Sequence, residues 1–464
     1  MLAVLTVQQD RQGNRGVTMC LVAQPTATNL GIAAILRFIA EPHTPPPTSV
    51  FCTMFNLPEV ATRLSKNVEV LVDEIDKTGS QPNCGNPTLL GPRGLAAREE
   101  IIVAAEKLLQ QGRGPGPSLL SLLESAVDVG TIQTLIRLEV PDQVPSTGSI
   151  TYDALAKKLK TPVAPELLQR LIRFTRLAGF LDEDEEGAVK HSPMSAIFVS
   201  DPDSAGQARF MADFGIRPCS FLYESIKLDP SGEVTRLGPL ALMAREPGAH
   251  EGPTFFEVLE KDPVNRNRWH DGMAVHNDSM VRHVAGAYDW HAVQSLVDIG
   301  GSEGHVATVI AKAFPHIQVT VQDRPEIIEK ARRRVDQHRN ITFEEHDFFT
   351  PQPRIADAYF LRLILHDWND ADCTRIVRQI SSALRPGARL LIMDAVLPEP
   401  GEGSLQSERQ LRRSDIGMYT LFSAKERSLV QMRRLVEDCD SRLRFEKLYT
   451  PPGSHASMLS WICE

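Results

Sequence analysis

A glycine-rich turn that follows a short apolar run is the feature of this chain with the clearest chemical meaning. The segment LVDIGGSEG, at 296–304, ends its apolar run at Asp298 and continues into Gly300 and Gly301. A second apolar run, VTVQD, ends at Asp323. Glycines allow backbone N–H groups to approach a ligand closely, and a carboxylate at a strand tip can bind both hydroxyls of a ribose. The pattern predicts a strand, a turn, a helix and a second strand around a nucleoside-containing cofactor.

The spacing of the glycines distinguishes between nucleoside cofactors. The turn reads GGxxG, whereas a dinucleotide-binding turn reads GxGxxG, and the acidic residue Glu303 lies inside it. A carboxylate that faces a pyrophosphate would repel it, so a cofactor without phosphate fits better. S-adenosylmethionine, which carries a sulfonium cation, is such a cofactor. The alternative is a structural strand–helix turn that binds no ligand.

A further strand end carries two residues that could bind a nucleoside. Asp347, in the segment HDFF, could accept a hydrogen bond from an adenine amino group while Phe348 packs on the ring. The alternative for Asp347 is a helix N-cap or a solvated strand end. Both residues therefore enter the predicted cofactor site.

One histidine lies where a general base would be needed. His366, in LRLILHDWND at 361–370, follows an apolar strand and precedes a polar turn, so we expect it at the mouth of the cleft. The pKa of a free imidazole lies near the working pH, which suits general-base catalysis. Asp394, which ends LLIMD, and Glu426, in SAKER, could flank the imidazole and stabilise the imidazolium. The alternative is a hydrogen-bonded structural histidine.

These residues require an alternating α/β architecture to bring them together. Strands and helices alternate after Trp290, which favours a mostly parallel sheet with helices on both faces. Ligands bind such sheets beyond the C-terminal strand ends, where the residues above lie. We expect strands at 295–299, 318–323, 341–346, 357–362, 389–395, 445–449 and 457–462, and helices at 304–314, 325–337, 371–384 and 424–438.

The N-terminal half has a different pattern. Residues 1–53, with the segment PHTPPPTS, are expected to be disordered, or to be upstream sequence wrongly joined to the chain. From 119 to 200 the pattern of helices and a β-wing is typical of a winged helix, and 205–290 is helical. DNA binding by the helix at 165–180 is one interpretation, but acidic residues follow it directly, which favours a dimerisation and substrate-lid module. The arginines concerned are Arg170, Arg173 and Arg176.

The composition excludes several classes of protein. The chain has 464 residues, 42% hydrophobic and 23% charged, with a net charge of −9, which disfavours nucleic-acid partners. Its seven cysteines form no CxxC pair, so reduced thiols in a cytoplasmic protein are expected instead of a zinc site or disulfides. The best candidate for a membrane span, at 17–40, is interrupted by polar residues, so no membrane partner is expected.

Taken in order, these motifs resemble the fungal branch of the plant-type, caffeate-like O-methyltransferase family. The segments LVDIGGSEGH, FPHIQVTVQD, HDFF, DAYFLRLILHDWND, IMDAVLP and LFSAKER carry the resemblance. It implies a winged-helix dimerisation domain at 54–205 and a helical connector that walls the acceptor pocket at 206–290. It also implies a Rossmann-like α/β methyltransferase domain at 291–464. The same resemblance implies S-adenosylmethionine as the cofactor, no metal ion, and a homodimeric assembly.

The resemblance assigns roles to individual residues. His366 matches the general base, and Asp394 and Glu426 match the acids beside it, although plant members usually carry glutamate in place of Asp394. Arg362 falls where the family has a basic residue close to the cofactor. Ser302 replaces the third glycine of the turn, which should permit binding if its φ is negative. The cofactor-binding positions are matched by Asp298, Gly300, Gly301, Asp323, Asp347, Phe348 and Arg362.

The reaction implied is methyl transfer to an oxygen of a small aromatic or polyketide-type secondary metabolite. Several side chains could line the acceptor pocket, although methionines and aromatic residues at such spacings more often belong to the core. They are Trp269, Met273, His276, Asn277, Met280, Tyr419 and Phe422. The alternatives are a dehydration or pericyclic ring closure that uses bound S-adenosylmethionine without methyl transfer, and a DNA-binding regulator.

Overall fold

The computed structural model describes residues 4–9, 15–20, 57–78, 90–334, 339–451 and 454–464. The chain divides into two compact units, Met1–Leu57 and Pro58–Glu464. In the first, β1 (Val4–Gln9) pairs antiparallel with β2 (Arg15–Cys20), and the disorder expected for 1–53 stays a prediction. The rest of that segment lies outside the described residues. The boundaries predicted at 205 and 290 fall inside the second unit and stay predictions.

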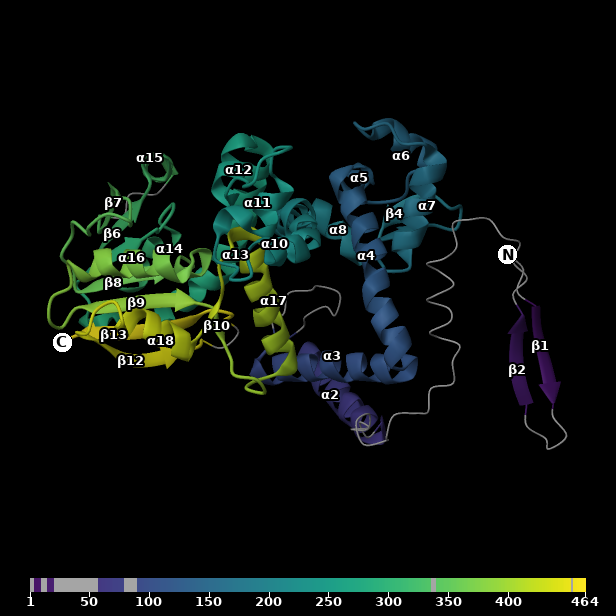
Figure 1. Ribbon diagram of the computed structural model, residues 1–464, viewed down its shortest axis with the longest axis horizontal. Helices are drawn as coiled ribbons and strands as arrows, with labels where there is room; N and C mark the ends of the chain where they lie inside the picture. Colours follow the sequence, from purple (N-terminus) through teal and green to yellow (C-terminus); the bar gives the residue numbers. More distant parts are fainter. Residues whose placement is uncertain (1–3, 10–14, 21–56, 79–89, 335–338, 452–453) are drawn as a thin grey trace. The chain divides into compact units, whose positions relative to one another are not determined.

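A seven-stranded sheet forms the C-terminal part of the second unit (Figure 1), in the order β12-β13-β9-β8-β5-β6-β7. The five strands from β9 to β7 in this order are parallel, and β13 runs antiparallel to both its neighbours. All seven strands were predicted, with ends that differ by at most two residues. They are β5 (Ser295–Ile299), β6 (Gln318–Asp323), β7 (Ile341–Glu345), β8 (Ala358–Arg362), β9 (Arg389–Asp394), β12 (Leu443–Tyr449) and β13 (Ser457–Cys463).

Helices cover both faces of this sheet, because two separate apolar clusters form on its two sides. One cluster joins the strands to α16 (Asp370–Ser381) and α18 (Leu429–Glu437). The other joins them to α13 (Pro263–Ala287), α14 (His305–Ala313) and α15 (Pro325–Arg334). The chain runs from β5 outward to β7 and returns to β8 on the other side of β5. That reversal opens a ligand crevice at the carboxyl ends of β5 and β8.

The segment between β9 and α18 differs from the prediction. The helix expected at 424–438 begins only at Leu429, because β11 (Arg427–Ser428) pairs in parallel with β10 (Val396–Leu397). A helix that was not predicted, α17 (Leu405–Phe422), precedes this pair. Residues 423–426 thus form a loop that carries Glu426 toward the ends of the strands.

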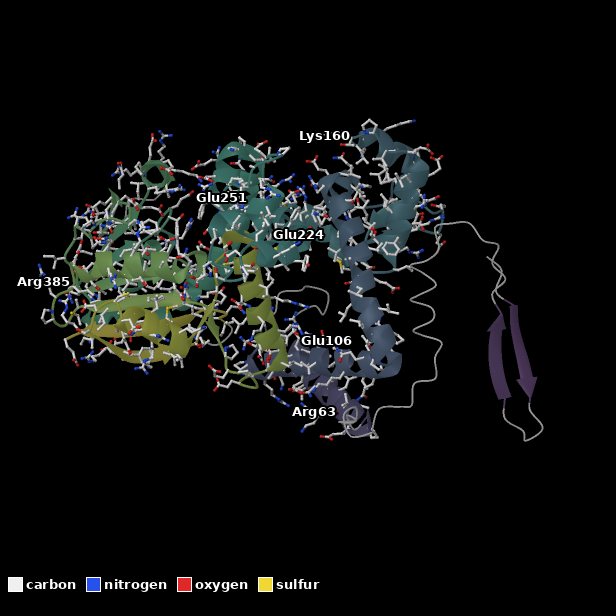
Figure 2. The ribbon with its side chains drawn as sticks, in the orientation of Figure 1. Arg63, Glu106, Lys160, Glu224, Glu251 and Arg385 are labelled. Carbon is white, nitrogen blue, oxygen red and sulfur yellow. The ribbon has the colours of Figure 1, made fainter. Side chains whose placement is uncertain are left out.

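Three long helices begin the second unit: α2 (Leu57–Thr78), α3 (Pro92–Arg113) and α4 (Pro115–Arg137). Figure 2 labels Arg63, which pairs with Glu100 of α3, and Glu106, which pairs with Arg409 of α17. Among the described residues, one helix, α4, is long and apolar enough to cross a membrane by length and composition alone. It is not the segment at 17–40 that the sequence suggested.

The region predicted to be a winged helix contains short helices followed by a two-stranded wing, an arrangement that fits that prediction. It consists of α5 (Val140–Gln143), α6 (Tyr152–Lys158), α7 (Pro165–Arg176) and a wing of β3 (Leu181–Glu183) and β4 (Val189–His191). Arg173 lies 2.9 Å from Glu183, and Arg176 lies 2.8 Å from Asp182. Acids of the wing thus pair with two of the three arginines considered for DNA binding, which weakens that interpretation.

The region predicted to be helical at 205–290 is helical throughout most of its length. Short helices follow one another and bury aromatic side chains against α13 and α17. They are α9 (Pro202–Phe210), a π-helix (Met211–Gly215), a 3₁₀ turn (Arg217–Phe221), α10 (Leu222–Leu228), α11 (Pro239–Met243) and α12 (Phe255–Lys261), and α8 (Pro193–Ser200) precedes them.

Candidate active site

The glycine turn leaves no room for side chains. Gly300 has a φ of +68°, and a Cβ added there would lie 2.5 Å from Cδ1 of Ile364. A Cβ on Gly301 would lie 2.6 Å from Oδ2 of Asp298. Both positions therefore require glycine, and the exposed backbone between β5 and α14 forms a cradle for a ligand at the carboxyl end of β5.

Asp298 lies buried beneath this turn. Its Oδ2 atom is buried and has no hydrogen-bond partner among the described residues. Burial raises the pKa of Asp298 to about 7; the guanidinium of Arg362 opposes this rise, and Asp323 adds to it. A buried acceptor without a protein donor is costly unless a ligand supplies one. The arrangement fits a cofactor that carries a hydrogen-bond donor or a positive charge.

Asp323 joins the end of β6 to the turn. Its Oδ2 accepts the backbone N–H of Ser302 at 2.9 Å, and its Oδ1 accepts the N–H of Arg324 at 2.8 Å. Each carboxylate oxygen can accept further hydrogen bonds, so both remain able to bind ribose hydroxyls. Burial raises the pKa of Asp323, an effect that these two N–H donors oppose.

Two expectations about the turn need correction. Ser302 has a φ of +52°, so the negative φ that was expected to permit cofactor binding is not observed. Its N–H instead points at Asp323, which the left-handed backbone makes possible. Glu303 lies 2.5 Å from Lys330 of α15. Because this ion pair neutralises Glu303, repulsion of a pyrophosphate is a weaker argument than the sequence suggested.

Replacing Ser302 by glycine is expected to stabilise the protein by about 0.5–1 kcal/mol. The substitution removes the cost of a left-handed serine, and part of that gain is lost to the greater entropy of glycine in the unfolded chain. Thermal unfolding should show a small rise in Tm, while S-adenosylmethionine affinity stays unchanged because the N–H to Asp323 is retained. Ser302→Ala keeps a Cβ and is the control. A gain in the alanine variant as well would contradict the backbone explanation.

Phe348 lies beside the turn, and Asp347 lies at the surface. A Cβ on Gly300 would be 3.9 Å from Cε1 of Phe348, which places this ring at the ligand side of the turn. Asp347 is exposed, and its Oδ1 accepts the N–H of Phe349 at 3.0 Å, as in a turn-capping residue. This contact leaves the second carboxylate oxygen for an adenine amino group.

His366 and Glu426, which are 60 residues apart, meet at this end of the sheet. His366 lies in a 3₁₀ turn, Leu365–Asp367, and its Nδ1 is 3.2 Å from Oε1 of Glu426. Ser414 of α17 donates a hydrogen bond of 2.8 Å to the same oxygen. Nε2 of His366 lies 3.6 Å from Oδ1 of Asp367, beyond hydrogen-bond distance. Nδ1 is thus held by the protein, and Nε2 remains able to exchange a proton with a ligand.

The imidazole lies in a cluster of carboxylates. Its removal from water disfavours the charged form, but Asp367, Glu426 and Asp394 outweigh this effect and raise the pKa of His366 to about 10. Burial raises the pKa of Asp394; the charge of His366 opposes this rise, and Glu426 adds to it. Both oxygens of Asp394 are buried without a hydrogen-bond partner among the described residues. The cluster therefore favours positive charge.

Arg362 ends β8 between the turn and this cluster. Burial lowers its pKa, and the carboxylates of Asp298 and Asp394 oppose that change. The guanidinium thus interacts electrostatically with an acid on each side of it. This position is close to the crevice between β5 and β8 where the sequence placed the cofactor.

Three residues around the histidine were not assigned a role from the sequence. Among the neighbouring acids, Asp367 has the largest effect in raising the pKa of His366. Ser414 bonds the carboxylate of Glu426, and Asp415 accepts the backbone N–H of Glu426 at 3.0 Å. The adjacency of Asp367 to His366 could have indicated its effect. Ser414 and Asp415 lie on the unpredicted helix α17, so no sequence pattern pointed to them.

The predicted acceptor residues separate into three groups. Trp269 and Phe422 belong to an aromatic cluster, with ring centroids 4.9 Å and 4.6 Å from that of Phe255. Tyr419 lines a cavity of about 380 Å³ between α17 and residues 226–233, and its hydroxyl lies 3.0 Å from Oγ of Ser225. The side chains of the remaining four lie outside the described residues: Met273, His276, Asn277 and Met280.

This chain is similar to known O-methyltransferases along most of its length. Residues 247–439 match the O-methyltransferase domain. The chain is 94% identical over 411 residues to 6-hydroxytryprostatin B O-methyltransferase of Neosartorya fischeri, covering 89% of this chain and 100% of the relative. It is 46% identical over 417 residues to O-methyltransferase FrzF of Cladobotryum sp., covering 86% and 97%. This chain belongs to the plant-type O-methyltransferase family.

The fold of this O-methyltransferase agrees with its family. The crystal structure of OxaC in complex with SAH and oxaline superimposes with a TM-score of 0.67, at 24% identity, over 87% of this chain and 100% of that chain. The enzyme uses S-adenosylmethionine to methylate an oxygen of a secondary metabolite. Methyl transfer is therefore favoured over the dehydration, ring-closure and DNA-binding alternatives.

Proposed function

We propose that this enzyme methylates the 6-hydroxyl of 6-hydroxytryprostatin B, with His366 as the general base. The choice of acceptor rests on 94% identity along the whole length of a relative with that activity. The choice of base rests on one contact, the 3.2 Å pairing of Nδ1 of His366 with Glu426, which leaves Nε2 for the acceptor hydroxyl.

The cofactor site would be formed by the ends of β5, β6 and β8. S-adenosylmethionine, when bound, supplies a methyl group made electrophilic by the sulfonium. The backbone of the turn at 300–301 would approach the cofactor closely, and Asp323 would bind the ribose hydroxyls. Asp347 and Phe348 would hold the adenine. Asp298 and Arg362 lie beneath the turn and would complete the charge balance there.

The acceptor proton would move to Nε2 of His366. A hydroxyl of phenol type has a pKa near 10, so little of it is ionised at neutral pH. Proton uptake creates an imidazolium, which Glu426 stabilises at Nδ1 while Asp394 and Asp367 stabilise it through space. Alignment of oxygen, methyl carbon and sulfur would supply most of the rate gain, about 7–11 kcal/mol. General-base assistance would add a factor of about 10²–10⁴.

A direct assay tests the proposed reaction. Purified protein, 6-hydroxytryprostatin B and methyl-labelled S-adenosylmethionine should give a labelled product heavier by one CH₂ group. The same compound without the 6-hydroxyl is the control and should remain unlabelled. Label in both compounds would place the methyl group elsewhere, and label in neither would refute the acceptor. We propose a metal-independent reaction, so EDTA should leave the rate unchanged.

We also propose that the enzyme is a homodimer that covers the apolar face of α4. Large side chains of this helix are exposed, with Leu122 at 71% and Leu123 at 65%. Burying a leucine contributes about 1.5–3 kcal/mol, so a contiguous face of this kind favours a protein partner. A second copy of the chain is the partner that the family resemblance suggests.

Replacing Leu122 and Leu123 together by glutamate is expected to give a monomer. The two carboxylates would have to lose their hydration when the subunits associate. The free-energy cost of this desolvation exceeds the stabilisation gained from the apolar contact. Light scattering after size exclusion should show the mass of two chains for the wild type and one for the variant. Glu124→Gln, on the same exposed helix, is the control. A dimeric double variant, or a wild type that is monomeric and sediments with lipid vesicles, would refute the proposed interface.

The cysteines bear on where in the cell the enzyme is located. Four cysteines of the described residues, Cys219, Cys373, Cys439 and Cys463, form no disulfide. This agrees with a reducing compartment, and we propose the cytoplasm. A fluorescent fusion that concentrated in a membrane-bound organelle would contradict it.

A further inference from the structure

Arg427 is a fully buried arginine, and most of its hydrogen bonds lead to the segment around the candidate base. It is 1% exposed. Its Nη1 donates to the carbonyl of Leu365 at 2.8 Å, and its Nη2 donates to the carbonyl of Trp368 at 2.9 Å. These two carbonyls lie on either side of His366 and Asp367 in the chain. The guanidinium therefore holds the turn that carries the imidazole at both ends.

The remaining donors of Arg427 complete this arrangement. Nε and Nη2 donate to Oδ1 of Asp370 at 3.0 Å and 2.7 Å, and Nη1 reaches the carbonyl of Lys425 at 3.4 Å. All five N–H groups of the guanidinium thus have acceptors. A buried charge is tolerated only with such complete pairing, and only arginine offers five donors in one rigid plane.

The chain positions of these contacts connect three segments of the candidate site. Glu426 lies between Lys425 and Arg427, and both neighbours bind Asp370, Lys425 at 2.6 Å through Nζ. Arg427 also pairs with Val396 in the β10–β11 ladder, two residues after Asp394. The segments that carry His366, Glu426 and Asp394 therefore all meet at one residue, the first two through its side chain and the third through its backbone.

We infer that Arg427 is a positioning residue that fixes the distance between His366 and Glu426. The inference rests on the proposed roles of these two residues. Arg427 touches neither of their functional groups in the described contacts and is buried away from any ligand, so it acts through them. A displacement of about 1 Å at such a site can reduce turnover by about 10²-fold.

Arg427→Lys tests this inference, since lysine keeps the charge but cannot bond four acceptors in one plane. We expect kcat for methyl transfer to fall by about 10–100-fold, with the S-adenosylmethionine affinity measured by calorimetry unchanged. The midpoint of the pH profile of kcat/KM should also move to lower pH, because Glu426 would stabilise the imidazolium less. Arg433→Lys, at a 47% exposed side chain on α18, is the matched control and should behave as the wild type.

A double-mutant cycle separates positioning from a general structural role. If Arg427 acts through Glu426, adding Glu426→Gln to Arg427→Lys should cause little further loss. Losses that multiply, an unchanged kcat in folded Arg427→Lys, or a loss that only follows the folded fraction would overturn the inference. Should Arg427→Lys fail to fold, Asp370→Asn, at a half-exposed residue, should show the same changes to a smaller degree. An inactive wild type would refute the proposed function instead, and an active wild type with an equally active variant would refute only the inference.

Discussion

His366→Ala is expected to reduce kcat by at least about two orders of magnitude while S-adenosylmethionine affinity stays close to that of the wild type. The alanine variant lacks Nε2, the atom that is proposed to take the proton of the acceptor hydroxyl. The glycine turn and Asp323, which are proposed to contact the cofactor, follow β5 and end β6. Binding of S-adenosylmethionine should therefore be retained. Steady-state kinetics and calorimetry on one preparation measure both quantities.

The control for this variant is His291→Ala, at an exposed histidine just before β5. It should retain full turnover, which separates loss of the base from loss of stability. Turnover in His366→Ala that equals the wild type would remove His366 from the mechanism. A variant that also lost S-adenosylmethionine affinity would show that the imidazole belongs to the cofactor site.

The sheet was predictable because most of its strands are short runs rich in apolar residues, separated by polar turns. Asp298, Asp323 and Arg362 lie in the last two residues of parallel strands whose carboxyl ends meet at one edge, so their proximity followed from the topology. The residue types suggested that Glu426 could flank His366, and the family resemblance assigned it to that place. No local pattern indicates that a loop at 423–426 returns to the sheet.

Other features depended on contacts that a sequence does not display. The left-handed φ of Ser302 follows from its hydrogen bond to Asp323, 21 residues later. Trp269 and Phe422 are of residue types that often line ligand pockets, and in the structure their rings pack on Phe255 in an aromatic cluster. In the sequence, Arg427 cannot be distinguished from the many other charged residues. It is buried only because the fold brings three distant segments of the chain around it.

Asp367→Asn is expected to lower the pH at which the enzyme becomes active. Proton acceptance requires neutral His366, and the carboxylates around it raise its pKa to about 10 in the free enzyme. The wild-type kcat/KM should therefore increase with pH through a midpoint well above the ordinary histidine value of 6.5. Removing the Asp367 charge removes the largest stabilisation of the imidazolium, so the midpoint should fall by about 1–3 pH units.

The stability of the protein should change with pH in the same direction. A histidine whose folded pKa is raised stabilises the fold fully below its unfolded pKa, and this contribution is lost as pH rises through the folded pKa. The wild type should therefore lose stability between pH 6.5 and about 10, and Asp367→Asn should lose it over a lower interval. Because the acids and the imidazole titrate together, both profiles report the cluster as a unit.

Glu426→Gln distinguishes the charge effect from orientation. Like Asp367→Asn, this substitution removes a carboxylate. Unlike Asp367→Asn, it also weakens the contact of 3.2 Å that holds Nδ1 of His366. Its midpoint should fall as in Asp367→Asn, and its limiting kcat at high pH should fall as well. Asp367→Asn keeps Glu426 in place and should retain most of that limiting kcat. If the midpoint stayed at the wild-type value in both variants, a group other than His366 would control proton transfer.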